Sequence, residues 1–298
     1  MTDILASDYN AIRAKVLQIL GTGSGSSGYG QVVQSSNVVT GNLITAEQWS
    51  LLRADIVNIR LHQDGAVPTL PSISQGLPIV LSAAAANFGF VTVLDSSFSS
   101  RFNIGSGRSQ VSAGASQSRT GSWTVQSQCV ATITFSNANE ARFFFNSGGK
   151  IRFTSSRTGG SASSQNNAWS NVLTAAGTQS FSGDISLPHH FYKLTNNYSD
   201  NLFYTISAST PYSANYYELA AKCNVANNNT GTATAVDFRI TWRDNYFDLF
   251  PSSPPPGDLV DGTLEIQISE FKATGSLIPT GSFDIISPSF SITSITAS

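Results

Sequence analysis

The sequence predicts a mainly β, α+β protein: an N-terminal helical hairpin with a glycine-rich loop, then a large antiparallel β-sandwich-like body with one short helix. Apolar residues recur every three or four positions before Gly65 and every second position after about Ile79. A proline-bearing stretch, which disfavours helix, separates the two patterns. We therefore expect an N-terminal helical attachment region at 1–65, a linker at 66–80 and an antiparallel β-rich body at 81–298.

The first helix is expected over residues 7–20. Its apolar side chains recur at helical spacing, Ser7 is placed to cap its start, and Gly21 is placed to end it. The second helix is expected to begin at Thr45, which forms a capping box with Gln48, and to end at Gly65. Short helices are marginal in water, so the apolar faces must pack on each other or on a partner. A partner interface would then consist of Tyr9, Ile12, Val16, Trp49, Leu52 and Ile56.

Glycines at positions 23, 25 and 28 match the spacing of the dinucleotide-binding fingerprint. That motif must follow a strand and open a helix, whereas these glycines follow a helix. Gly148-Gly-Lys150 does not make a phosphate-binding loop either, because Phe144 stands where the first glycine belongs. The glycine-rich segment is expected to be a flexible loop, and no cofactor is expected.

The body is expected to contain half-buried antiparallel strands. A long strand is predicted at 123–135, and a hairpin is predicted from 143–145 and 151–153 around the turn at 146–149. Alternating segments predict further strands at 202–206, 217–225, 236–242 and 264–268, with a short edge strand within 283–295. One helix is expected over 167–176, with Trp169 and Leu173 on one face.

The chain is unusually poor in charge. Only 11% of its 298 residues are charged, against roughly 25% in an ordinary domain. With 16 basic and 18 acidic residues it has no basic stripe for nucleic acid, and its apolar stretches are far shorter than the roughly 20 residues that span a bilayer. The N-terminus does not resemble a signal peptide, so we expect the mature chain to begin at Met1. A neutral hydrogen-bonding surface suits contacts with copies of itself or with neighbouring subunits.

Few residues offer catalytic or metal chemistry. His189 and His190 would point to opposite faces of a strand, and no carboxylate lies at ligand spacing. Cys129 and Cys223 fall on inward strand positions and are expected to be buried thiols; a disulfide would require their strands to face each other. We expect no catalytic, cofactor or metal site.

Two surface hypotheses remain open. The carboxylates at positions 244, 248, 258 and 261 could act as a glycosidase pair or as calcium ligands, or they could serve the turns in which they lie. Tyr212, Tyr216 and Tyr217 lie among asparagines, and flat rings with amides suit a sugar-binding surface. Strand tyrosines are also ordinary core and rim residues.

Several stretches resemble the virion structural proteins of tailed bacteriophages, notably those of cyanobacterial phages. They are Asp8-Tyr-Asn-Ala-Ile-Arg13, Leu20-Gly-Thr-Gly-Ser-Gly25, Gly28-Tyr-Gly-Gln31, Ile44-Thr-Ala-Glu-Gln-Trp49, Leu52-Arg-Ala-Asp-Ile56, His62-Gln63 and Glu140-Ala-Arg-Phe-Phe-Phe-Asn-Ser-Gly-Gly-Lys150. The resemblance runs in patches from residue 8 to about 180. The β region that follows is similar in its general character and shares no specific motif.

The resemblance implies a non-enzymatic structural subunit of the virion, in the tail, a tail fibre or the baseplate and neck. Its expected partners are further copies of itself, most simply as a trimer, and other virion proteins. An alternative is a module of a tail fibre that binds host-surface glycans. A third hypothesis, a glycan-degrading enzyme, would need two of the carboxylates to converge in a cleft.

Overall fold

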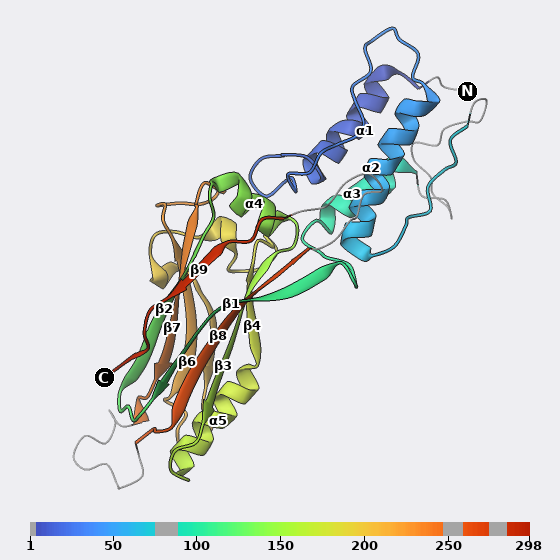
Figure 1. Cartoon of the computed structure of the whole chain (residues 1–298). Helices are drawn as coiled ribbons and strands as arrows, with labels where there is room; N and C mark the ends of the chain where they lie inside the picture. The colour runs from blue at the N-terminus through green and yellow to red at the C-terminus, as the bar shows by residue number, and fades with distance from the viewer. Residues whose placement is uncertain (1–3, 75–88, 247–258, 274–284) are drawn as a thin grey trace. The chain divides into compact units, whose positions relative to one another are not determined.

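Two antiparallel sheets and five α-helices make up the described part of the computed structural model, which covers residues 4–74, 89–246, 259–273 and 285–298 (Figure 1). The chain divides into two compact units, and each is discontinuous in sequence. The helical unit comprises residues 1–110, 142–149 and 272–286; the β unit comprises residues 111–141, 150–271 and 287–298. The sequence predicted a boundary between the two parts at 66–80. The helical unit instead extends to residue 110 and also includes two later segments.

The helical unit contains α1 (Ala6–Ile19), α2 (Ala46–Asp64) and α3 (Phe90–Ser99). The Trp49 ring lies 5.1 Å from Tyr9 and 5.6 Å from Phe90, so the first turns of the three helices meet. Past the end of α1, Tyr29 contacts His62 in the last turn of α2, with 4.8 Å between ring centroids. The helices therefore run in the same direction, and the structure does not confirm the helical hairpin expected from the sequence.

The segment between α1 and α2 returns along α1, which explains the parallel arrangement. The Asn10 side chain donates to the Val38 carbonyl at 2.8 Å and accepts the Val38 N–H at 2.9 Å. Arg13 Nε donates to the Ser35 carbonyl at 2.8 Å. The capping box expected at Thr45 is present, and Gly65 ends α2 at φ 72°. At α1 the first capping residue is Leu5 rather than Ser7, because the Asp8 carboxylate accepts the Leu5 N–H.

A fourth helix, α4 (Ala138–Asn146), occupies the place of one expected strand. The sequence predicted a hairpin around 146–149, but residues 143–145 are helical. Asn137 caps this helix by accepting the Glu140 N–H at 3.0 Å, and Glu140 accepts the Ser136 N–H at 3.2 Å. This asparagine cap at the start of α4 was missed in the sequence.

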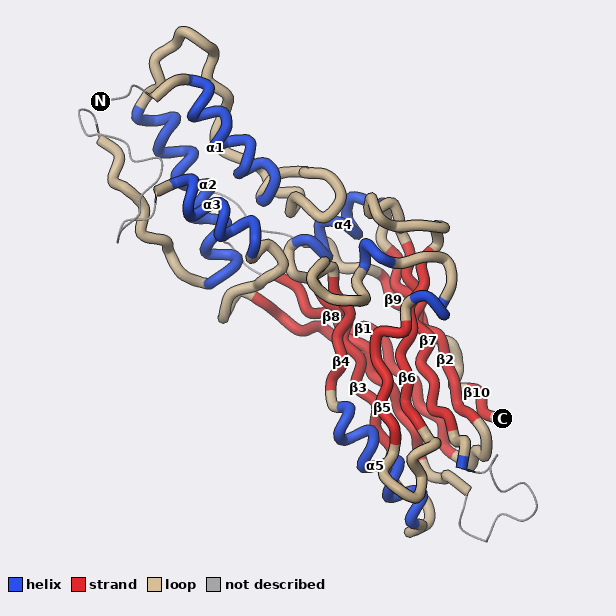
Figure 2. Tube along the Cα trace, turned by 180° about the vertical axis from the view of Figure 1, so that it is seen from behind, coloured by secondary structure: helices blue, strands red, loops and turns tan. Residues whose placement is uncertain are grey.

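The β unit contains two sheets, drawn as strands in Figure 2. The first has the order β1-β8-β3-β4, formed by β1 (Ser109–Thr120), β8 (Thr263–Ala273), β3 (Lys150–Thr158) and β4 (Thr178–Ser182). The second has the order β10-β2-β7-β6-β5, formed by β10 (Thr296–Ala297), β2 (Gln126–Thr134), β7 (Ala235–Arg243), β6 (Tyr216–Cys223) and β5 (Leu202–Ser207), with β9 (Ser289–Ile292) also on β2. The registered pairs are all antiparallel, as alternation predicted.

The two sheets share an aromatic core. The Phe153 ring on β3 lies 4.9 Å from Phe238 on β7, and Phe181 on β4 lies 5.2 Å from the same ring. Trp242 on β7 donates its indole N–H to the Ser155 hydroxyl on β3 at 2.9 Å. Contacts of this kind are compatible with a β-sandwich-like α+β fold. The helix expected at 167–176 is α5 (Ser164–Ala176), and its end at Gly177 was expected.

Candidate contact surfaces and groove

The residues expected to form a partner interface instead form the core of the helical unit. All six are at most 2% exposed: Tyr9, Ile12, Val16, Trp49, Leu52 and Ile56. The apolar faces of α1 and α2 pack within the unit, which was one of the two alternatives left open. These side chains cannot also contact another protein, so the interface prediction is wrong for them.

The helical unit exposes other apolar side chains near the start of α1 and α2. Leu5 is 61% exposed, Val39 68% and Leu43 91%. Leu5 immediately precedes α1, Val39 follows the residue held by Asn10, and Leu43 lies just before the cap of α2. We call these three residues the apolar tip.

The segment that carries Val39 and Leu43 is held to the helices by polar side chains. The Asp55 carboxylate, which is fully buried on α2, accepts the N–H groups of Gln34 and Ser35, both at 2.9 Å. Arg13 donates through its Nη1 to the Asn37 side chain at 2.9 Å. Val39 thus follows closely on a stretch that hydrogen bonds hold to the helices.

The glycine-rich loop is held in place as well. Arg142 on α4 donates to the carbonyls of Thr22, Gly25 and Ser27 at 3.0–3.2 Å. Asn146 donates to the Gly25, Ser27 and Gly28 carbonyls at 3.0–3.2 Å. The loop was expected to be flexible; its carbonyl oxygens instead bind side chains distant in sequence. A phosphate-binding loop would need its N–H groups to face the ligand.

In the β unit, the structure separates the three tyrosines of the glycan hypothesis. Tyr217 is 1% exposed and its ring stacks on Trp242 at 6.0 Å; burial raises the pKa of its hydroxyl. A buried ring cannot contact a sugar, so Tyr217 is removed from that hypothesis. Tyr216 is half-buried on β6, the strand next to the edge strand β5. Tyr212 is half-buried in the β5–β6 connection.

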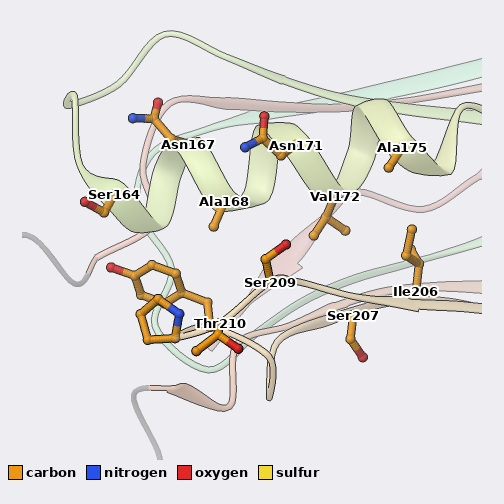
Figure 3. A pocket seen from close by; sticks show the side chains of 12 residues that line it. Ser164, Asn167, Ala168, Asn171, Val172, Ala175, Ile206, Ser207, Ser209 and Thr210 are labelled. Carbon is orange, nitrogen blue, oxygen red and sulfur yellow. The ribbon is translucent and has the colours of Figure 1, made fainter.

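Tyr212 lines a groove of about 440 Å³ between α5 and the β5–β6 connection (Figure 3). On the helix side, Ala168, Val172 and Ala175 point toward the strand, as the figure shows. The lining contains no charged residue and combines hydroxyls, amides and small apolar groups: Ser164, Asn167, Ala168, Asn171, Val172, Ala175, Ile206, Ser207, Ser209, Thr210, Pro211 and Tyr212. Its volume lies within the range of small-molecule sites, roughly 300–1,000 Å³.

The described carboxylates are occupied by structural hydrogen bonds. Asp244 is fully buried and accepts from the Gln165 side chain. Asp261 accepts the Ser161 N–H and the Asn166 side chain, which lower its pKa. These contacts tie α5 and its preceding loop to the sheets and favour the turn interpretation. Asp248 and Asp258 lie outside the described residues.

The histidines and cysteines do not converge either. His189 and His190 are half-buried, and desolvation lowers the pKa of each. Cys129 on β2 and Cys223 on β6 are buried free thiols on either side of β7, so they do not face each other across the core. Burial raises the pKa of Cys129 to about 12. Within the described ranges, no three His, Cys, Asp or Glu side chains are grouped to hold a metal ion.

No protein-family model, curated protein or solved structure matches this chain. In the part of the chain that the structure describes, no helix has the length and apolar character needed to cross a membrane.

Proposed function

We propose that this protein is a non-enzymatic structural subunit of a bacteriophage particle, in the tail, a tail fibre or the baseplate and neck. In this proposal it docks through its N-terminal region and assembles as a homo-oligomer. The observation that carries the docking role is the apolar tip of Leu5, Val39 and Leu43. Exposed apolar side chains that gather in a patch are typical of protein-binding sites. Leu5 immediately precedes α1, and Leu43 lies just before the cap of α2.

Two further observations support the proposal. The resemblance to phage virion proteins is concentrated in the residues that build the helical unit, including Trp49 and Gly28-Tyr-Gly-Gln31. The charged fraction of 11% leaves a neutral surface, whose burial between subunits requires little desolvation of charge. The apolar tip thus replaces the buried helix faces as the proposed docking surface.

The test is incorporation into particles. Mass spectrometry of purified particles of the phage that encodes the chain is expected to detect it as a stoichiometric component. A Val39→Asp/Leu43→Asp variant should lose incorporation, because two carboxylates would have to be desolvated at the contact. Leu187→Asp is the matched control: Leu187 is 43% exposed in the β unit. Absence from particles would overturn the proposal; undiminished incorporation of the tip variant would overturn docking through the tip.

The groove favours a second candidate function, the binding of host-surface glycans. A sugar ring presents hydroxyls and an apolar C–H face, which match the uncharged hydroxyls, amides and Tyr212 ring of the lining. Tyr212 is held against Tyr246, with 4.7 Å between ring centroids.

A neutral-oligosaccharide array tests this candidate. Binding that is abolished by Ala168→Trp, which would fill the groove, and retained by Thr174→Trp would support it, because Thr174 lies on the same helix outside the lining. Absence of binding by the wild-type protein, or equal binding by both variants, would argue against the groove as a glycan site.

A further inference from the structure

The free edges of the two sheets differ in a way that points to an assembly contact. In the described chain β1 and β4 end the first sheet, and β5 and β10 end the second. A sheet edge presents unpaired N–H and C=O groups that can pair with another strand. Three of these edges are short or broken: β4 has five residues, β10 has two, and the β5 ladder is irregular between Leu202 and Tyr204. The β1 edge is a strand of 12 residues.

Strand β1 also lacks the usual features that prevent edge pairing. It contains no proline, and its single charged residue is Arg119. Arg119 donates to the Ser122 carbonyl at 2.9 Å, beyond the end of the strand. None of the 12 side chains is buried, although β8 pairs with β1 on one side. The segment from Ser112 to Ser118 therefore offers uncharged side chains, all of them small except Gln117, beside an open row of backbone groups.

The strand is nevertheless fixed within the β unit. A Cβ added at Gly114 would lie 2.7 Å from the Phe290 ring, so β1 packs closely against β9 at this point. At its end, the Thr120 and Thr263 hydroxyls are 2.9 Å apart, and Gly121 donates its N–H to the Gly262 carbonyl at 3.0 Å. The open edge of β1 is thus an ordered surface.

We infer that this edge pairs antiparallel with β1 of a second copy of the chain. The inference rests on the homo-oligomer of the proposed function and names its contact. With the two-fold axis at Ala115, Ala113 of one copy lies opposite Gln117 of the other, and Arg119 lies opposite Val111. Each pair of directly opposed residues then contains at most one charged side chain, so no like charges face each other. Such self-compatibility favours a second copy as the partner.

Size-exclusion chromatography with light scattering tests the pairing. The wild-type protein should give an even multiple of 31.6 kDa. The lysines of an Ala113→Lys/Gln117→Lys variant would lie directly opposite those of the second copy, so this variant should elute with half the wild-type mass or less. The control is Thr205→Lys/Ser207→Lys on the edge strand β5, which should retain the wild-type mass. Circular dichroism checks that each variant is folded.

Cysteine cross-linking provides a readout that does not depend on the lysine variants folding. Ala115→Cys should form a disulfide-linked dimer under mild oxidation, because opposed residues in an antiparallel pair have Cα atoms about 4.5–5.5 Å apart. Cys129 and Cys223 are buried, so they should contribute little background. Thr205→Cys should remain uncross-linked.

The outcomes separate this inference from the proposed function. A trimer, which contains no two-fold axis, would overturn the β1 pairing and leave the homo-oligomer standing. An oligomer of unchanged mass in the β1 lysine variant, or absence of the Ala115→Cys cross-link, would do the same. A wild-type monomer would overturn both. An even-numbered wild-type assembly that the β1 lysines dissociate and Ala115→Cys links would support both.

Discussion

Buried polar side chains join segments of the helical unit that are distant in sequence. Gln63 donates to the Ser97 carbonyl at 2.9 Å and to the Tyr29 hydroxyl at 2.7 Å, and the His62 Nε2 bonds to the Ser147 carbonyl at 2.9 Å. Each of these groups was desolvated on folding and is costly to leave without its partner. Single substitutions at these positions are therefore expected to destabilise the fold more than changes on the surface.

His62 should make stability depend on pH. Burial lowers the pKa of this imidazole to about 4, against an unfolded value near 6.5, while its bond to the Ser147 carbonyl opposes the shift. The unfolded chain therefore binds the proton more tightly between these values. The stabilisation is complete above pH 6.5 and is lost as pH falls toward 4, by about 3 kcal/mol between pH 7 and 4.

Urea unfolding of the wild type and of His62→Gln at a series of pH values measures this effect. The glutamine retains an N–H donor and does not titrate, so its unfolding free energy should vary less between pH 4 and 6.5. Parallel pH profiles of the two proteins would show that His62 is not responsible.

Alternation placed Tyr217 in phase with Cys223, which was expected on the inward side of its strand. Tyr216 and Tyr217 are adjacent on a strand, so one of them had to point inward. The structure buries Tyr217, which lies opposite Trp242 on β7, and leaves Tyr216 half-buried. Tyr212 reaches the groove because of the path of the β5–β6 connection, for which a single sequence carries no periodic signal.

At the scale of elements, periodicity predicted the half-buried strands and failed where the apolar signal was weak or ambiguous. Strands β2, β6 and β7 were expected because their inward residues alternate with polar ones. Strand β1 was missed, because it is made of small neutral residues and buries none of them. Helices α3 and α4 were missed because short apolar runs suit strand and helix equally.

Helix α4 is expected to stabilise the glycine-rich loop through Asn146. Its amide group donates to three loop carbonyls, and Asn146→Asp would place a carboxylate against those oxygens. Loss of the donors and repulsion by the new charge should lower the unfolding free energy by about 3 kcal/mol. Urea denaturation provides the measurement.

Asn139→Asp provides the matched control for this substitution. It lies in the same helix at an exposed position near the N-terminus, where a negative charge is tolerated. Equal stabilities of the two variants would show that the bonds between α4 and the loop contribute little.

At the scale of the whole molecule, the low charge has a consequence for assembly. The chain carries a formal net charge of −2, and the proposed β1 contact contains one charged residue per copy. Salt screens interactions between charges and has little effect on backbone hydrogen bonds. The apparent dissociation constant of the homo-oligomer should change less than about threefold between roughly 50 and 500 mM NaCl.

Analytical ultracentrifugation at the two salt concentrations measures this prediction. A tenfold or larger weakening at high salt would show that ion pairs hold the subunits together. Such a result would exclude the neutral contact surface as the main source of affinity.

The bonds between α4 and the glycine-rich loop bear on how the chain matures during synthesis. Asn146 follows its partner Gly28 by 118 residues. At about 5–20 residues per second, a ribosome needs roughly 6–24 s to make that stretch. Throughout this interval the Gly25, Ser27 and Gly28 carbonyls lack their final donors, so the helical unit cannot be completed as it leaves the exit tunnel. The bonds from Asn146 cannot form until the first strands of the β unit have been translated.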